Sequence, residues 1–77
     1  MSREAIDLDA LEELAKAATP GPWRANRSTA YGYAVVETPD VEVSAELDAV
    51  DAAFIAAADP STVLALIARI REAEGRA

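Results

Sequence analysis

The segment Thr19–Arg24, which reads Thr-Pro-Gly-Pro-Trp-Arg, constrains the fold of this chain more than any other stretch. Thr19 precedes a proline and is therefore pushed away from helical backbone geometry. Pro20 and Pro22 have no amide hydrogen to donate, and the glycine between them permits a sharp turn. A helix that arrives from the N-terminal side must end here, just before the single tryptophan and its neighbouring arginine.

The residues before this turn have the pattern of an amphipathic helix over about residues 7–18. Leu8, Leu11 and Leu14 recur at helical spacing on one face. Acidic residues crowd the first turns, where the helix dipole favours them. We therefore expect a helix that the proline turn stops.

The residues after the turn alternate and predict a β meander over about residues 23–45. Its clearest strand is Tyr31–Thr38, in which Tyr33 and Val35 point to one face and Ala34 and Val36 to the other. A Thr-Pro-Asp turn follows, and then a strand with one polar face. Three short antiparallel strands need a cover for their apolar face.

The last third predicts two helices, over about residues 47–58 and 60–74. Asp59 suits the N-cap of the second helix, and Pro60 suits its first position. The expected order is therefore α-β-β-β-α-α. It describes an α+β fold in which helices cover a small three-stranded antiparallel sheet, and we expect residues 1–77 to form a single small domain.

Length and composition limit what this fold can do. A chain of 77 residues buries a small core, and it has no cysteine or histidine for disulfides or the usual zinc sites. Such chains often gain stability by self-association, so we expect a homo-oligomer. A net charge of −7 opposes binding to nucleic acid. No apolar run is long enough to cross a membrane and the N-terminus does not resemble a signal peptide, so we expect a cytoplasmic protein.

Trp23 and Arg24 form the first candidate site. An indole face stacks on a planar base, and a guanidinium binds a phosphate through two hydrogen bonds. Arg27, Tyr31 and Tyr33 are expected to converge on the same place across the hairpin. The alternative is structural, with Trp23 closing the small core and Arg24 solvated.

Two acidic features give further candidates. Asp51 either accepts hydrogen bonds from a ligand or from Arg24, or has a structural role as an acceptor for the Trp23 indole or for amides of the proline turn. An acidic run either mimics the phosphates of nucleic acid toward a basic partner or is a solvated helix face. The run consists of Glu4, Asp7, Asp9, Glu12 and Glu13.

Catalysis is not expected. The chain has no cysteine or histidine to act as nucleophile or as a base near neutral pH. Glu12 and Glu13 are adjacent and face different directions on a helix, so they do not form a carboxylate pair around one substrate. No spacing of acidic residues singles out a metal site, and we expect no cofactor.

Two stretches of the chain form a distinctive pair of motifs. One is Ala15–Arg24, with its Thr-Pro-Gly-Pro-Trp turn, and the other is Asp51–Pro60, which reads Asp-Ala-Ala-Phe-Ile-Ala-Ala-Ala-Asp-Pro and precedes Val63–Ile67. Together they resemble the Ead-type family of small phage and prophage proteins. The resemblance implies a bacteriophage accessory protein in the cytoplasm of the bacterial host, without an established activity. Some members have a histidine where this chain has Ala57 or Ala58.

Three functions are consistent with these features. The first is a counter-defence protein that binds and sequesters a small anionic nucleotide-type signal of the host, with Trp23, Arg24, Arg27, Tyr31, Tyr33 and Asp51 as ligand-binding residues. The second is an acidic inhibitor of a host defence protein. The third is a structural or assembly protein without a ligand. We place the first ahead of the others because it uses the aromatic and cationic cluster.

Overall fold

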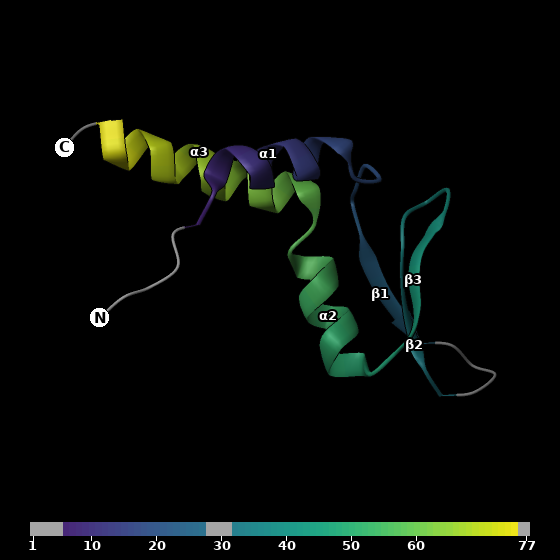
Figure 1. Ribbon diagram of the computed structural model, residues 1–77. Helices are drawn as coiled ribbons and strands as arrows, with labels where there is room; N and C mark the ends of the chain where they lie inside the picture. The colour runs from purple at the N-terminus through teal and green to yellow at the C-terminus, as the bar shows by residue number, and fades with distance from the viewer. Residues whose placement is uncertain (1–5, 28–31, 76–77) are drawn as a thin grey trace.

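A computed structural model describes residues 6–27 and 32–75 of the chain. It confirms the α+β class and the predicted order of elements (Figure 1). The elements are α1 (Leu8–Ala17), β1 (Arg24–Arg27), β2 (Ala34–Glu37), β3 (Glu42–Leu47), α2 (Ala49–Ala57) and α3 (Pro60–Gly75).

Local signals in the sequence explain both ends of α1. Asp7 is its N-cap, and one of its carboxylate oxygens accepts a hydrogen bond of 3.0 Å from the amide of Ala10. At the other end, the amide of Ala18 donates to the carbonyl oxygen of Leu14, and the backbone then becomes extended before the first proline. The proline turn therefore ends the helix as its sequence predicts.

The three strands form an antiparallel sheet in the order β1-β2-β3. In the first pair, Arg24 lies opposite Glu37 and Arg27 lies opposite Ala34. The second pair is irregular, with shifts of register on both sides of Val36. The turn between β2 and β3 is closed by Thr38, whose amide donates to the carbonyl oxygen of Val41 over 2.7 Å.

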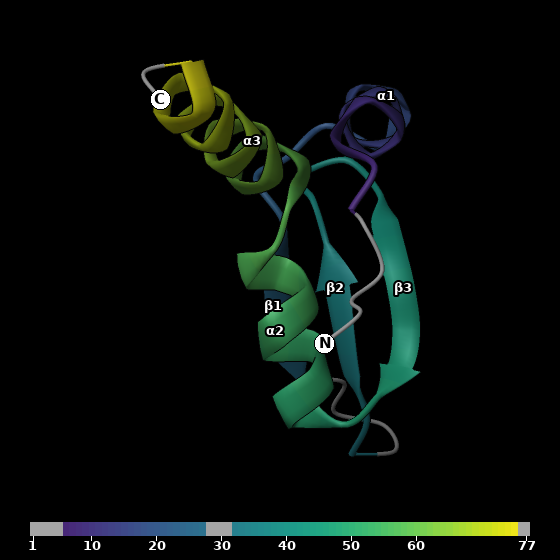
Figure 2. The same cartoon turned by 60° about the vertical axis from the view of Figure 1, so that its left-hand side comes forward.

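The helix α2 covers one face of this sheet and packs on β1 and β2 (Figure 2). Ala34 and Val36 of β2 and Ala52 of α2 form the buried cluster. Five partly buried side chains pack against it, namely Trp23, Val43, Leu47, Ile55 and Ala56. Alternation along β2 therefore selects the predicted face that carries Ala34 and Val36 as the inner face.

The helices α1 and α3 lie side by side and form the second half of the molecule (Figures 1 and 2). Each buries an apolar side chain, Ala15 on α1 and Ile67 on α3. Arg71 of α3 donates a hydrogen bond of 2.9 Å to Glu12 and also contacts Asp9. Ion pairing therefore adds to the apolar contact between the two helices.

The helices α2 and α3 meet at a bend of 53° after Ala57. Among the described residues, no single helix has the length and apolar composition of a membrane span, and only this bent pair reaches them together. The bend directs α3 away from the sheet and toward α1. Two connections therefore join the halves of the molecule, the proline turn between α1 and β1 and the bend between α2 and α3.

Candidate functional site

The two connections meet at the carboxylate of Asp59, which is 8% exposed. One of its oxygens accepts a hydrogen bond of 3.0 Å from the amide of Thr62 and so caps the start of α3. The other accepts a longer bond of 3.3 Å from the amide of Trp23, 36 residues away in the sequence. We call the contact between Asp59 and the segment Gly21–Trp23 the Asp59 latch.

The side chain of Trp23 makes a second contact that holds the proline turn. Its indole nitrogen donates a hydrogen bond of 2.8 Å to the carbonyl oxygen of Thr19. Its ring is half-buried and packs against the cluster formed by the sheet and α2. Both N–H groups of this residue therefore bind within the chain, and the ring contributes to the core.

A side chain at position 21 would crowd the latch. A Cβ atom on Gly21 would lie 2.9 Å from a carboxylate oxygen of Asp59 and 3.3 Å from the amide nitrogen of Trp23. The first distance is shorter than ordinary contacts allow. The peptide bond that follows, between Gly21 and Pro22, is cis.

The hydrogen bonds that Asp59 accepts lower the pKa of its carboxyl below the ordinary value. The amide of Thr62 contributes most, the amide of Trp23 adds to it, and burial opposes both. On α1, the hydrogen bond from Arg71 likewise lowers the pKa of Glu12. Both carboxylates therefore favour the folded state only while they are ionised.

This direction of shift predicts a loss of stability in acid. Unfolded aspartate titrates near pH 3.9, so the contribution of Asp59 is complete above about pH 4 and disappears as the pH falls through its lower folded value. We expect the melting temperature of the wild type to fall steeply below about pH 4. The variant Asp59→Asn should melt lower at neutral pH and show a shallower acid decline, which thermal denaturation followed by circular dichroism measures. An equally steep decline in the variant would contradict this origin.

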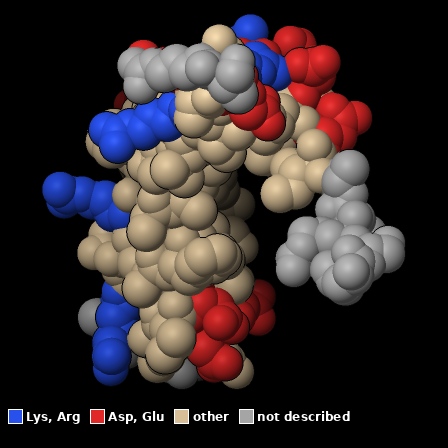
Figure 3. Space-filling view, turned by 90° about the vertical axis from the view of Figure 1, so that its left-hand side faces the viewer, with Lys and Arg blue, Asp and Glu red and all other residues tan. Residues whose placement is uncertain are grey.

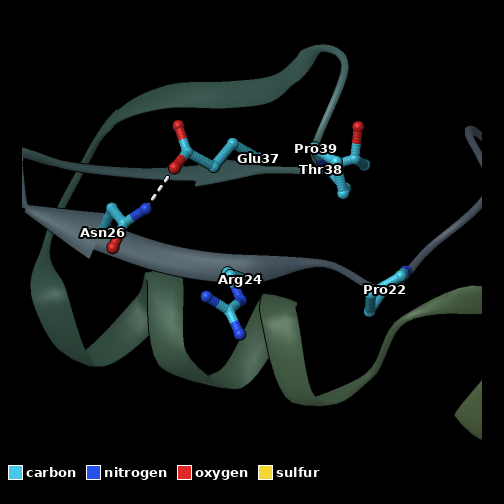
Figure 4. Close-up of a pocket in the computed structure, with 6 residues that line it drawn as sticks. All are labelled: Pro22, Arg24, Asn26, Glu37, Thr38 and Pro39. Atoms are coloured by element: carbon cyan, nitrogen blue, oxygen red, sulfur yellow. Dashed lines mark hydrogen bonds between the residues drawn. The ribbon is translucent and has the colours of Figure 1, made fainter.

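The face of the sheet away from α2 carries a cavity of about 440 Å³ beside β1 (Figure 4). Arg24 and Asn26 are two residues apart on this strand and therefore share a face, and Glu37 lies opposite Arg24 on β2. The cavity is lined by Pro22, Arg24, Asn26, Glu37, Thr38 and Pro39.

Two of the polar side chains that line this cavity bind each other, and a third, the arginine, does not take part. The side-chain amide of Asn26 donates to the carboxylate of Glu37, as the dashed line in Figure 4 shows. The guanidinium of Arg24 has neither a hydrogen bond nor an ion pair with any described residue. The cavity therefore contains the Arg24 cation, whose hydrogen-bond donors are unused, beside Asn26 and Glu37, which bind each other.

A second cavity of about 300 Å³ adjoins the first, because Thr38 and Pro39 line both. It lies between the proline turn and the turn that joins β2 to β3. Its lining is formed by Thr19, Pro20, Gly21, Thr38, Pro39, Asp40 and Val41. The proline turn thus contributes Pro22 to one cavity and Pro20 to the other.

The structure separates the residues that the sequence analysis grouped into one ligand site. Trp23 packs toward α2, whereas Arg24 lines a cavity that Trp23 does not reach. Arg27 lies at the opposite end of β1, and Tyr33 is 47% exposed just before β2. Asp51 is exposed on α2, and Tyr31 lies outside the described residues.

The acceptor for the proline turn is Asp59, which was not expected in this role. In its structural alternative, Asp51 was expected to accept a hydrogen bond from the Trp23 indole or from the turn amides. Instead, the indole donates to the carbonyl oxygen of Thr19 and the Trp23 amide donates to Asp59. An Asp-Pro pair at a helix break was the available signal, because a capping carboxylate uses one oxygen and leaves the other for a distant donor.

The predicted acidic face is partly neutralised within the chain. Arg71 contacts both Asp9 and Glu12, and Lys16 lies 3.9 Å from Glu12 and from Glu13. Glu4 lies outside the described residues. Within residues 6–27 and 32–75, no three acidic side chains gather closely enough to hold a metal ion.

Comparison with known protein families gives a match over nearly the full sequence. A family model described as Ead/Ea22-like protein matches residues 4–77, which is almost the whole chain. A search of curated proteins and a search of solved structures gave no significant match. The matched range includes both the proline turn and the Asp-Pro pair that meet at the latch.

Proposed function

Because the chain belongs to the Ead/Ea22-like family of phage accessory proteins, we propose that it is a non-catalytic counter-defence protein that binds and sequesters a small anionic nucleotide-type signal of the host. The observation that carries this proposal is the cavity around Arg24. Its volume of about 440 Å³ lies within the range of small-molecule sites. The guanidinium there is unpaired among the described residues and so has donors to spare.

Each lining group of this cavity has a role toward a nucleotide. Arg24 binds a phosphate through two parallel hydrogen bonds. Asn26 and Glu37 supply a donor and acceptors for the edge of a base or for ribose hydroxyls. The rings of Pro22 and Pro39 give apolar surface for the face of a base. In this arrangement Trp23 acts indirectly, because it fixes the turn that carries Pro22 and Arg24.

The shape of the site and the charge of the chain favour a small ligand over a nucleic-acid strand. A net charge of −7 repels a polyanion, whereas a compact anion meets mainly the local charge of Arg24. The adjoining cavity of about 300 Å³ gives a ligand longer than one nucleotide room for its second half. Linear and cyclic dinucleotides therefore belong in the test beside mononucleotides.

The acidic inhibitor has less support from the geometry. Asp9 and Glu12 are already bound by Arg71, so a basic partner would compete with an internal ion pair for these two carboxylates. We therefore keep nucleotide sequestration as the proposed function. Binding to a host protein remains the alternative if no nucleotide binds.

A thermal shift measurement tests the proposal directly. A nucleotide present at a hundred times its dissociation constant stabilises the folded state by about 2.7 kcal/mol. That value corresponds to roughly 10–20 °C in the melting temperature of a domain of this size. We expect one member of a panel of mononucleotides and linear and cyclic dinucleotides to produce such a shift, and Arg24→Ala to remove it.

The variant Arg69→Ala is the matched control, because Arg69 is an exposed arginine on α3, outside both cavities. It should keep the full shift. The proposal is wrong if no nucleotide in the panel raises the melting temperature of the wild type. It is equally wrong if Arg24→Ala binds as tightly as Arg69→Ala.

A further inference from the structure

The helix α2 is apolar around almost its whole circumference. Its sequence contains alanine, valine, phenylalanine and isoleucine, with Asp51 as the one charged residue. Ala52, Ile55 and Ala56 face the sheet and are buried or half-buried. A helix that is apolar on all sides is normally covered on all sides, but the sheet covers only one side of α2.

The uncovered side of α2 forms a continuous apolar stripe. Val50, Ala53, Phe54 and Ala57 follow the spacing of one helical face, and all four are exposed. Val50 is 80% exposed and Phe54 is 73% exposed. We call these four residues the outer stripe of α2.

Figure 3 looks at the molecule from the side on which α2 faces away from the sheet. It shows an uncharged surface that runs down the middle of this face. In the lower part of this face, basic side chains lie along one margin and acidic side chains along the other, whereas the top carries charges of both signs. The middle of the face therefore has the character of the core of a protein interface, and its margins have the character of a charged rim.

The chain also buries too little apolar surface by itself. Among the described residues, the buried apolar side chains are Ala15, Ala34, Val36, Ala52, Pro60 and Ile67, three of them alanines. The radius of gyration is 15.1 Å, whereas a compact chain of this length has about 11.5 Å. A fold this open needs additional burial that a single copy does not provide.

We propose that the outer stripe of α2 is the contact between two copies of this chain, with α2 of one copy against α2 of the other. We choose a second copy as the partner because every copy of the chain lacks buried apolar surface, and another copy is present wherever the chain is made. Ala53 and Ala57 let the two helices approach closely, while Val50 and Phe54 fill the space between them. Margins of opposite charge suit a two-fold arrangement that joins the basic margin of each copy to the acidic margin of the other.

This inference stands apart from the proposed nucleotide site. Arg24 and Asn26 lie on the face of the sheet away from α2, so a dimer through α2 leaves their cavity open. Failure of nucleotide binding would leave the dimer unaffected. A monomeric protein would leave the nucleotide test unaffected in turn.

Sedimentation equilibrium of the full chain at about 100 µM tests the dimer, since a dissociation constant near 1 µM leaves little monomer at that concentration. We expect the wild type to sediment at twice its monomer mass of 8.1 kDa. Val50→Glu should shift it to the monomer mass. Val41→Glu is the matched control, because Val41 is an exposed valine in the turn between β2 and β3, and it should leave the dimer intact.

Cross-linking keeps the test decisive if Val50→Glu fails to fold. The chain has no cysteine, so Val50→Cys and Val41→Cys each introduce a single thiol. A short bismaleimide should link Val50→Cys into a covalent dimer and leave Val41→Cys unlinked. A folded wild type that sediments as a monomer overturns the proposal. Equal cross-linking of the two cysteine variants, or a folded Val50→Glu that stays dimeric, overturns it as well.

Discussion

Replacement of Asp59 by alanine is expected to destabilise the fold by about 2–4 kcal/mol. Two effects add at this residue. Loss of the N-cap leaves the amide of Thr62 without its partner at the start of α3, and loss of the second oxygen leaves the amide of Trp23 unpaired in a part-buried place. A domain of this size has a total stability of only about 4–12 kcal/mol, so the variant approaches the limit of folding.

Two other aspartates at helix starts provide graded controls. Asp7 caps α1 through a single hydrogen bond to Ala10 in an exposed position, so Asp7→Ala should cost less than Asp59→Ala. Asp48 stands at the N-cap of α2 but makes no side-chain capping bond, so Asp48→Ala should be close to neutral. Urea denaturation followed by circular dichroism gives the free energy of unfolding of each variant.

The order of the three effects is the informative result. If the latch joins the two halves of the molecule, Asp59→Ala lowers the free energy of unfolding more than Asp7→Ala does. Asp7→Ala in turn lowers it more than Asp48→Ala does. An Asp59→Ala variant no less stable than Asp7→Ala would mean that Asp59 acts only as a helix cap. The bond to Trp23 would then contribute nothing measurable.

The order of elements was predictable because it rests on local signals. The proline turn had to end a helix, and the alternation that follows it had to form strands. Asp59 and Pro60 were likewise predicted as the N-cap and first residue of the last helix, and the amide of Thr62 does donate to Asp59. Each of these signals lies within a few residues of the feature that it predicts.

The predicted ends of the strands and helices differ from the structure by a few residues. The meander was expected to end near residue 45, but β3 continues to Leu47, and α2 begins at Ala49 rather than near residue 47. The register shifts between β2 and β3 and the positive φ of 60° at Glu46 explain why simple alternation misjudged this end. Irregular pairing of this kind depends on the neighbouring strand and leaves little trace in one sequence.

The candidate site was predictable only in part, for a reason of geometry. Consecutive residues in extended backbone point to opposite sides, so Trp23 and Arg24 diverge although they are neighbours in the sequence. The companions of Arg24 come from the register, which places Glu37 opposite it and Asn26 beside it. The sequence predicts that a hairpin forms but does not determine which residues it pairs.

The latch gives a physical reason why this chain contains both the proline turn and the Asp-Pro pair at the bend between α2 and α3. A turn with two prolines and a glycine leaves the amide of Trp23 directed at the bend between α2 and α3. An aspartate at that bend satisfies the amide and starts α3 with the same carboxylate. Neither motif completes its hydrogen bonds without the other, so a change in one should alter the tolerance to changes in the other.

Gly21→Ala tests this dependence and is expected to destabilise the protein by about 1–3 kcal/mol. The new methyl group would lie 2.9 Å from the Asp59 oxygen that binds the Trp23 amide, so the carboxylate must move and lengthen a bond that is already 3.3 Å. Gly75→Ala is the matched control, because a Cβ atom there meets nothing within 4 Å and alanine suits a helix better than glycine.

The double variant Gly21→Ala with Asp59→Ala then separates a clash at the latch from a general strain of the turn. If the methyl group acts through the carboxylate, most of its effect disappears once Asp59 is alanine. The losses in free energy of unfolding of the two single variants then sum to more than the loss in the double variant. We expect a coupling free energy of about 1 kcal/mol or more from urea denaturation of the four proteins. Losses of stability that add to within about 0.5 kcal/mol would show that Gly21 is required by the turn itself, because the new Cβ atom would lie 3.3 Å from the amide nitrogen of Trp23.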